Sequence, residues 1–255
     1  MRRFITLFCY QLHLMAISFS TYAAAFLFLS FMALMYLVGL VEISVGPSRQ
    51  SPTELFLSIF WVPVLFLVPL ITMKSLSEER RMGTLGTLMT TPVSAWQIVL
   101  SKFLACYFFY VILWVATLAF PLITAMYMPR TAVDARIFDI WQIGTGYAFI
   151  FVSGAMYVAV GIFASSLTRS TLVSGMLSFC MLFFAIIGSG LLSNFPLPES
   201  GAMALLTKPA EYMQTFKHLE DFSMSIMDTR PFFFYLSTAL LLLSFTSLIT
   251  ESKNA

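Results

Sequence analysis

Six long segments without a charged side chain constrain this chain more than any other feature of its sequence. A helix needs roughly 20 consecutive apolar residues to cross the hydrocarbon core of a bilayer. Five segments are long enough for one span each, and a sixth is longer: Leu55–Met73, Phe103–Pro129, Ile140–Thr168, Ser170–Pro198, Pro231–Thr250 and Phe4–Val41. With 59% of its 255 residues hydrophobic and only 10% charged, the chain is far more apolar than a soluble domain. We therefore predict an all-α membrane protein with six transmembrane helices.

The first segment, Phe4–Val41, is too long for a single span. Its 38 residues would reach almost twice the roughly 30 Å of the hydrocarbon core if they formed one helix. Four polar side chains at its start recur at spacings of three and four residues, which places them on one face of a helix: Arg3, Thr6, Tyr10 and His13. We predict an amphipathic helix at 3–17 that lies in the membrane interface, followed by the first span at 18–40.

Local signals predict the bounds of the remaining elements. Ser51-Pro52-Thr53-Glu54 and Ser94-Ala95-Trp96-Gln97 each match a capping box at a helix start. Pro63 and Pro69 should kink the second span. Small residues four positions apart favour close helix packing, within the chain or in a dimer: Ala155/Ala159, Gly161/Ser165 and Ser174/Ser178. The later spans are predicted at 55–73, 98–124, 144–168, 171–192 and 231–250, with an extracytoplasmic segment at 193–230.

An even number of spans places both termini on one side of the membrane. That side would carry eight of the basic residues and the other side six. Because cytoplasmic loops are enriched in Lys and Arg, we predict that both termini and the charged stretch Lys74–Lys102 are cytoplasmic. The expected location is the cytoplasmic (inner) cell membrane, which the chain crosses several times.

The sequence lacks the common signatures of catalysis. It has no Gly-x-x-x-x-Gly-Lys-Ser/Thr loop to cradle ATP phosphates, and no His-Glu-x-x-His or Gly-x-Ser-x-Gly motif. Cys9, Cys106 and Cys180 are interpreted as small buried apolar residues, and we predict neither a metal site nor a bound cofactor. Lys102 is the one ionisable residue expected inside a span. Because ion-coupled transporters bind their coupling ion at intramembrane carboxylates, any transport energy should come from another chain.

The stretch Lys74–Lys102 has the composition of a helix that docks into another protein. We predict a helix at 77–91, with charged residues for water and three apolar residues to bury: Met82, Leu85 and Leu88. The alternative is an ordinary solvated loop.

Lys74–Ala105 resembles the coupling-helix region of ABC type-2 export permeases, whose usual form is close to SEEKRSGTLELLLTSPVSxWEIVLGKFLA. The matching residues include Ser77-Glu78-Glu79-Arg80, Gly83-Thr84-Leu85, Thr90-Thr91-Pro92-Val93-Ser94 and Lys102-Phe103-Leu104-Ala105. A glutamate of this pattern is replaced by Gly86. His218–Ser237 is similar to the stretch before the last span in the gliding-motility and nitrous-oxide-reductase-maturation branch of that family.

The resemblance implies a permease subunit that performs no bond chemistry itself. A separate ATPase subunit would hold ATP and Mg, and a second permease protomer and membrane lipid would complete the assembly. The resemblance assigns docking on the ATPase to six residues: Glu78, Glu79, Arg80, Gly83, Thr84 and Leu88. We expect their charges to meet this partner and not to brace the permease. Two other functions stay open: a force-transmitting membrane subunit that carries no solute, and an intramembrane enzyme with polar clusters facing each other at mid-membrane depth.

Overall fold

The computed structural model describes residues 2–45, 56–84, 93–127, 140–188, 215 and 229–252. Within these ranges the regular elements are helices, and no strand occurs: α1 (Arg2–Ile17), α2 (Phe19–Val45), α4 (Trp61–Thr72), α5 (Ser77–Met82), α7 (Ala95–Thr117), α8 (Ala119–Tyr127), α9 (Ile140–Leu167), α10 (Thr171–Phe183), the π-helix η1 (Phe184–Gly188) and α14 (Arg230–Ser252).

Six of the described helical segments are long and apolar enough to cross a membrane: Phe19–Glu42, Trp61–Met82, Ala95–Thr124, Trp141–Leu167, Thr171–Gly188 and Arg230–Ser252. This confirms the predicted all-α, multi-pass fold. The predicted extracytoplasmic segment at 193–230 lies almost entirely outside the described residues.

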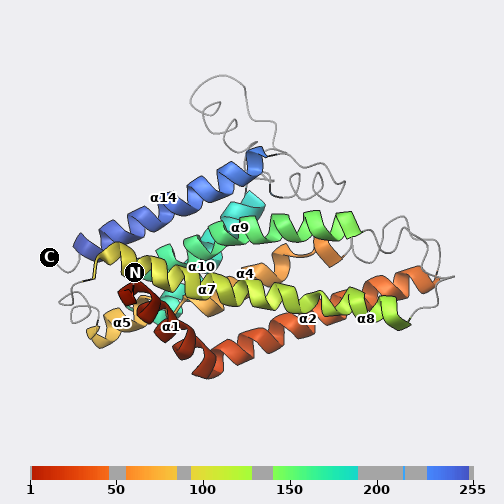
Figure 1. Cartoon of the computed structure of the whole chain (residues 1–255), viewed down its shortest axis with the longest axis horizontal. Coiled ribbons are helices and arrows are strands. Elements are labelled where there is room, and N and C mark those ends of the chain that lie inside the picture. The colour runs from red at the N-terminus through yellow and green to blue at the C-terminus, as the bar shows by residue number, and fades with distance from the viewer. Residues whose placement is uncertain are drawn as a thin grey trace, which may run out of the picture.

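Helix α9 is the centre of the bundle (Figure 1). It packs against α14, α10, α7 and α4, and α2 covers α4 and α7 from the other side. In an 18-residue apolar stretch of its span 78% of the residues are buried, against 22% in the corresponding stretches of α10 with η1 and of α14. The start of α1, the end of α14 and the short helix α5 lie at the same end of the bundle (Figure 1).

The long first segment is divided at Ser18 into α1 and α2, which meet at an angle (Figure 1). Helix α1 contacts α7. It turns Phe4, Leu7, Phe8, Leu12 and Met15 partly inward, and leaves Thr6, Tyr10 and His13 exposed. The polar face that the sequence predicted for α1 is therefore its exposed face. The depth of α1 in the membrane stays a prediction.

Three of the predicted helix signals lie in described residues: the capping box at Ser94, Pro63 and Pro69, the last of which lies inside the continuous helix α4. The capping box of α7 is confirmed, since Gln97 donates its backbone N–H to Ser94 Oγ (3.3 Å) and Gln97 Oε1 accepts from the backbone N–H of Ser94 (3.4 Å). The second span is interrupted at Ile59 and Phe60, ahead of α4. Pro63 accounts for this break, because a proline ring clashes with the carbonyl four residues earlier in a continuous helix. The box at 51–54 lies outside the described residues.

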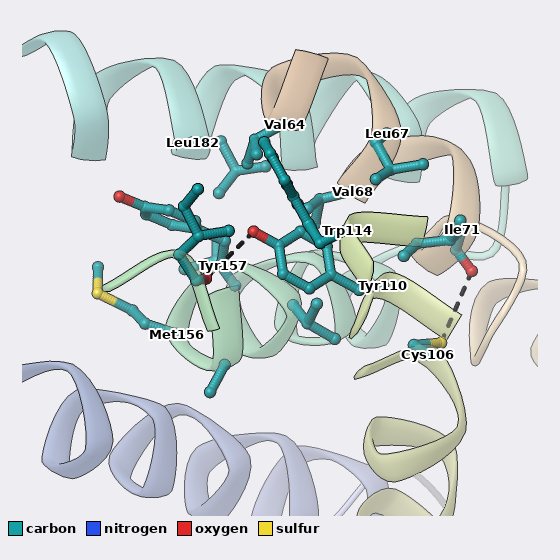
Figure 2. Packing of buried hydrophobic residues seen from close by; sticks show 14 of the residues in the cluster. Val64, Leu67, Val68, Ile71, Cys106, Tyr110, Trp114, Met156, Tyr157 and Leu182 are labelled. Atoms are coloured by element: carbon teal, nitrogen blue, oxygen red, sulfur yellow. Dashed lines mark hydrogen bonds between the residues drawn. The ribbon is translucent and has the colours of Figure 1, made fainter. Parts of the chain in front are cut away.

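The core is aromatic and closely packed. Tyr110 and Trp114 of α7 lie between the α4 row that includes Val64 and Val68 and the α9 side chain of Tyr157 (Figure 2). Tyr110 donates a hydrogen bond to the carbonyl of Ile150 (3.3 Å).

Gly154 and Gly161 let the neighbouring helices approach α9. A Cβ added to Gly154 would lie 2.2 Å from Tyr110 Cε1, and one added to Gly161 would lie 2.3 Å from Thr72 Oγ1. All three predicted small-residue pairs are buried within the chain. Gly161, a member of one pair, makes the close contact with Thr72 just described. Packing within the chain therefore explains them without a dimer.

The cysteines divide in a way that the sequence did not predict. Cys106 is buried, and its thiol donates to the carbonyl of Ile71 (3.7 Å; Figure 2). Cys9 and Cys180 are exposed at the protein surface, so the expectation that all three are buried is wrong. The reason is that a membrane helix is apolar on its lipid side as well as its protein side, and composition cannot distinguish the two.

Candidate coupling site

Helix α5 continues directly from α4 through a turn at residues 73–76, and the end of α9 holds this turn. Ser165 Oγ accepts hydrogen bonds from the backbone N–H groups of Leu76 and Ser77, both at 3.0 Å. It also donates to the carbonyl of Met73 (3.3 Å). Ser77 closes the turn from its own side by donating its hydroxyl to the same carbonyl. One α9 hydroxyl therefore fixes where α5 begins.

A buried ion pair joins α5 to α7. Lys102 Nζ lies 2.6 Å from Glu79 Oε1 and donates a second hydrogen bond to the carbonyl of Ser75 (2.7 Å). The Lys102 side chain is 2% exposed and that of Glu79 is 19% exposed. Because a charge that leaves water needs a close partner, this pair explains how a lysine is held within the apolar bundle.

A second inward contact joins α5 to the end of α9. Arg80 Nη1 donates a hydrogen bond to the backbone carbonyl of Ser166. This carbonyl is one of the last in α9, where the helix leaves its own acceptors unsatisfied and carries a partial negative charge. A guanidinium at this position both satisfies this hydrogen-bond acceptor and complements the partial negative charge of the helix end.

The opposite face of α5 carries the second pair of charges. Arg81 and Glu78 are 4.0 Å apart, with side chains that are 61% and 35% exposed. An ion pair this long and this open to water contributes little to stability. The sequence Glu78-Glu79-Arg80-Arg81 thus sends its middle two charges inward and its outer two outward.

Gly83 ends α5. Its φ of +71° lies in the left-handed region, and its backbone N–H returns to the carbonyls of Arg80 and Glu79. Thr84 follows in an exposed position, and its hydroxyl donates to the Glu79 carbonyl (3.3 Å). The helix predicted over 77–91 is therefore interrupted after Met82. Gly86 and Leu88 lie outside the described residues.

The geometry suits the transmission of movement more than chemistry. A short charged helix projects from one end of a membrane bundle and is bonded to three of its helices. Among the described residues, no three His, Cys, Asp or Glu side chains lie together as a group that could hold a metal ion. Several buried hydroxyls pair with one another or with carbonyls, as Tyr36 does with Thr124 (2.9 Å) and Thr117 with Tyr147 (2.8 Å).

Comparison with known families narrows the candidate functions. Residues 16–250 match the family described as ABC-2 family transporter protein. The chain belongs to the ABC-2 transporter family. It is thus a permease subunit of an ABC system, a multi-pass membrane protein that is not itself catalytic. This disfavours the intramembrane enzyme. No curated protein matches the chain.

The structure divides the six residues that were predicted to dock on an ATPase. Glu79 and Arg80 bond to α7 and α9 of the permease itself, so the expectation that they do not brace the chain is wrong. Their neighbour Glu78 is partly exposed, and Gly83 and Thr84 are exposed at the end of α5. Docking stays a prediction for all six residues, Leu88 included.

Sequence reasoning missed three residues that hold α5 in the permease. Ser165 was noted only as a small residue, and Ser166 was not noted. Lys102 was noted only as an isolated charge inside a span. A signal for Lys102 was available. Because an unpaired intramembrane charge is costly, it demands an acidic partner, and the nearest acids on the same side are Glu78 and Glu79.

Proposed function

We propose that this permease couples ATP hydrolysis on a separate ATPase subunit to the export of a substrate, through α5 and the residues that follow it to position 91. The observation that carries the proposal is the three-way attachment of α5. It continues from α4, pairs with α7 through Glu79 and Lys102, and is bonded to α9 through Ser165 and the Ser166 carbonyl. A displacement of α5 would therefore be passed to three helices of the bundle at once.

The outward face of α5 supports the same proposal. Glu78 and Arg81 form only a long ion pair that is open to water, and they flank the apolar side chain of Met82, which is 59% exposed. Charges around an apolar contact are typical of a protein interface, where they align the partners and the apolar group is buried.

In the proposed assembly, two permease and two ATPase subunits form the working unit. The ATPase subunits bind ATP and Mg, because this chain has no phosphate-binding loop. Closure of the ATPase dimer would push on α5 of each permease and rock the bundle between inward- and outward-facing states. Both termini and α5 would then face the cytoplasm of a cell whose inner membrane holds the complex.

A second candidate keeps this coupling but carries no solute. The similarity of His218–Ser237 to the gliding-motility branch favours it, since such a subunit would pass the movement to an envelope apparatus. Substrate-stimulated ATP turnover in reconstituted vesicles distinguishes the two. Stimulation by an added solute supports export, whereas turnover that responds only to an envelope partner supports force transmission.

The docking proposal is tested by cross-linking in the assembled complex. Arg81→Cys and Thr84→Cys, in a background without the three native cysteines, should each cross-link to the ATPase subunit. Glu251→Cys is the control, because Glu251 is also exposed and lies at the same end of the bundle. If the complex copurifies but only the control position cross-links, the ATPase binds elsewhere and the proposal is wrong.

A further inference from the structure

A cavity of about 480 Å³ opens beside α5, and the Lys102–Glu79 pair forms part of its lining. It lies between α1 and the start of α2 on one side, and the α4–α5 turn and α7 on the other. Its volume is within the roughly 300–1,000 Å³ of pockets that hold small ligands. Its lining carries two opposite kinds of surface.

One wall of the cavity is apolar. It is lined by Leu14 and Met15 of α1, Leu70 and Ile71 of α4, and Ala105 of α7. These residues lie in or beside the apolar helices, and Leu14 is 44% exposed. This wall would suit hydrocarbon.

The other wall carries one available cation. Lys74 is exposed, forms no ion pair with the described residues, and donates to Ser20 Oγ (3.1 Å). Ser20 in turn shares a hydrogen bond with Ser18 (2.8 Å). The second lysine of the cavity, Lys102, is already neutralised by Glu79. An ammonium beside two hydroxyls can bind a single phosphate group.

The same wall carries one available acid. Glu78 lines the cavity, and its described ion pair with Arg81 is long, at 4.0 Å. A carboxylate beside a phosphate site repels a purely anionic ligand, but it favours one that carries an amine next to its phosphate. The four charged residues of the lining, Lys74, Lys102, Glu78 and Glu79, also sum to zero.

We propose that this cavity binds the headgroup of phosphatidylethanolamine from the surrounding leaflet. The phosphate would lie on Lys74 and Ser20, the ammonium on Glu78, and the first acyl carbons on the wall formed by Leu14 and Leu70. Ethanolamine fits better than choline, because its ammonium donates hydrogen bonds to a carboxylate and a quaternary amine cannot. An anionic phosphatidylglycerol would offer Glu78 no ammonium to bind. This inference does not rest on ATPase docking.

The position of the cavity agrees with a lipid ligand. It lies where α1 meets the ends of α2, α4 and α7, and α5 with its exposed charges begins beside it. In the predicted topology this is the cytoplasmic end of the spans, where acyl chains end and headgroups begin. A bound lipid would touch both α1 and the α4–α5 turn.

The test uses the full-length permease, purified without its ATPase and stripped of lipid in detergent. Dioleoyl phosphatidylethanolamine, phosphatidylcholine and phosphatidylglycerol are titrated separately, and bound lipid is counted by native mass spectrometry. We expect phosphatidylethanolamine to bind about tenfold more tightly than the other two, the difference expected from one charge-assisted hydrogen bond. Equal binding of the three lipids, or tighter binding of phosphatidylglycerol, overturns the proposal.

Two variants locate the binding within the cavity. Lys74→Gln and Glu78→Gln should each weaken phosphatidylethanolamine binding about tenfold. The controls are Arg169→Gln and Glu251→Gln, which should bind as the wild type does, because both residues are exposed and neither lines the cavity. Wild-type affinity in both cavity variants contradicts the site. Soluble O-phosphoethanolamine is the last arm, and if it competes as well as the lipid at equal concentration, the ligand is not a lipid. Because no ATPase is present, these outcomes are independent of the docking proposal.

Discussion

The inner and outer faces of α5 carry the same residue types but differ in almost every physical respect. On the inner face, Glu79 reaches Lys102 at 2.6 Å in a nearly buried pair. On the outer face, Glu78 is 4.0 Å from Arg81, and both side chains are open to water. The comparison shows that, in a helix of six residues, charge alone does not tell which acid stabilises the permease and which is free for a partner.

The largest expected effect comes from breaking the inner pair. Glu79→Gln leaves the buried ammonium of Lys102 without its counter-charge and should lower the free energy of unfolding by about 3 kcal/mol. Glu78→Gln is the matched control, one position away, and should change it by less than about 0.5 kcal/mol. Thermal melting of the purified permease measures both. Adding Lys102→Met to Glu79→Gln should recover part of the loss, because it removes the stranded charge.

Equal melting of the Glu79→Gln and Glu78→Gln variants would contradict the division of α5 into two faces. It would mean that the Glu79–Lys102 pair stabilises the permease no more than a surface pair does.

The contacts on the inner face of α5 require α9 to lie close to α4. Disrupting this approach should have the next largest effect on the stability of the permease. Gly161 lies one helical turn before Ser165, against Thr72. Gly161→Ala would place a methyl group 2.3 Å from Thr72 Oγ1, and the resulting overpacking should cost about 2 kcal/mol. Gly144→Ala, in the same helix with nothing within 4 Å, should instead be neutral or stabilising by up to about 1 kcal/mol. If both variants melt alike, the separation of α4 and α9 is not set by Gly161.

The sequence predicted what depends on neighbours along the chain. The six apolar segments, the capping box at Ser94 and the polar face of α1 are all local patterns, and each requires only helix geometry to interpret. The Gly161/Ser165 pair indicated close packing but not its partner, which is the end of α4 and the α4–α5 turn.

The inner face of α5 could not be predicted in the same way. Lys102 and Glu79 are 23 residues apart, and only the packing of α7 against α4 brings them together. Which of two adjacent glutamates points inward depends on the rotation of α5, and this rotation is set by Ser165 of α9, a hydroxyl nearly 90 residues later in the chain. The resemblance to permeases identified the stretch but treated its charges as one set.

A single hydroxyl fixes the start of α5, and its removal should have a moderate effect. Ser165→Ala leaves the backbone N–H groups of Leu76 and Ser77, both fully buried, without an acceptor, and should cost about 1.5 kcal/mol. Ser166→Ala is the control. Ser166 is equally buried, but its hydroxyl bonds within α9, and it contacts Arg80 through its backbone carbonyl, which alanine retains. A loss of stability in Ser166→Ala as large as in Ser165→Ala would show that general packing, not the hydroxyl bridge, holds the turn.

The smallest effect on stability, and the largest on assembly, should come from the outer face. Arg81→Glu changes a side chain that is 61% exposed and weakly paired, so the melting of the isolated permease should shift by no more than about 0.5 kcal/mol. In the complex with the ATPase, reversal of a charge at the interface should weaken binding by about 2 kcal/mol or more, a factor of roughly 30. The exposed Glu251 provides the control Glu251→Lys, which reverses a charge at the same end of the bundle without touching α5.

Copurification with the ATPase and ATP turnover per folded permease give the measurement for this face. The outer face is a docking surface, and not an internal support, if Arg81→Glu melts normally but binds the ATPase weakly while Glu251→Lys binds it normally. If Arg81→Glu instead melts the permease as Glu79→Gln does, the outer face also holds the chain together. The two faces of α5 would then be one internal support, and the contact with the ATPase would have to lie elsewhere on the permease.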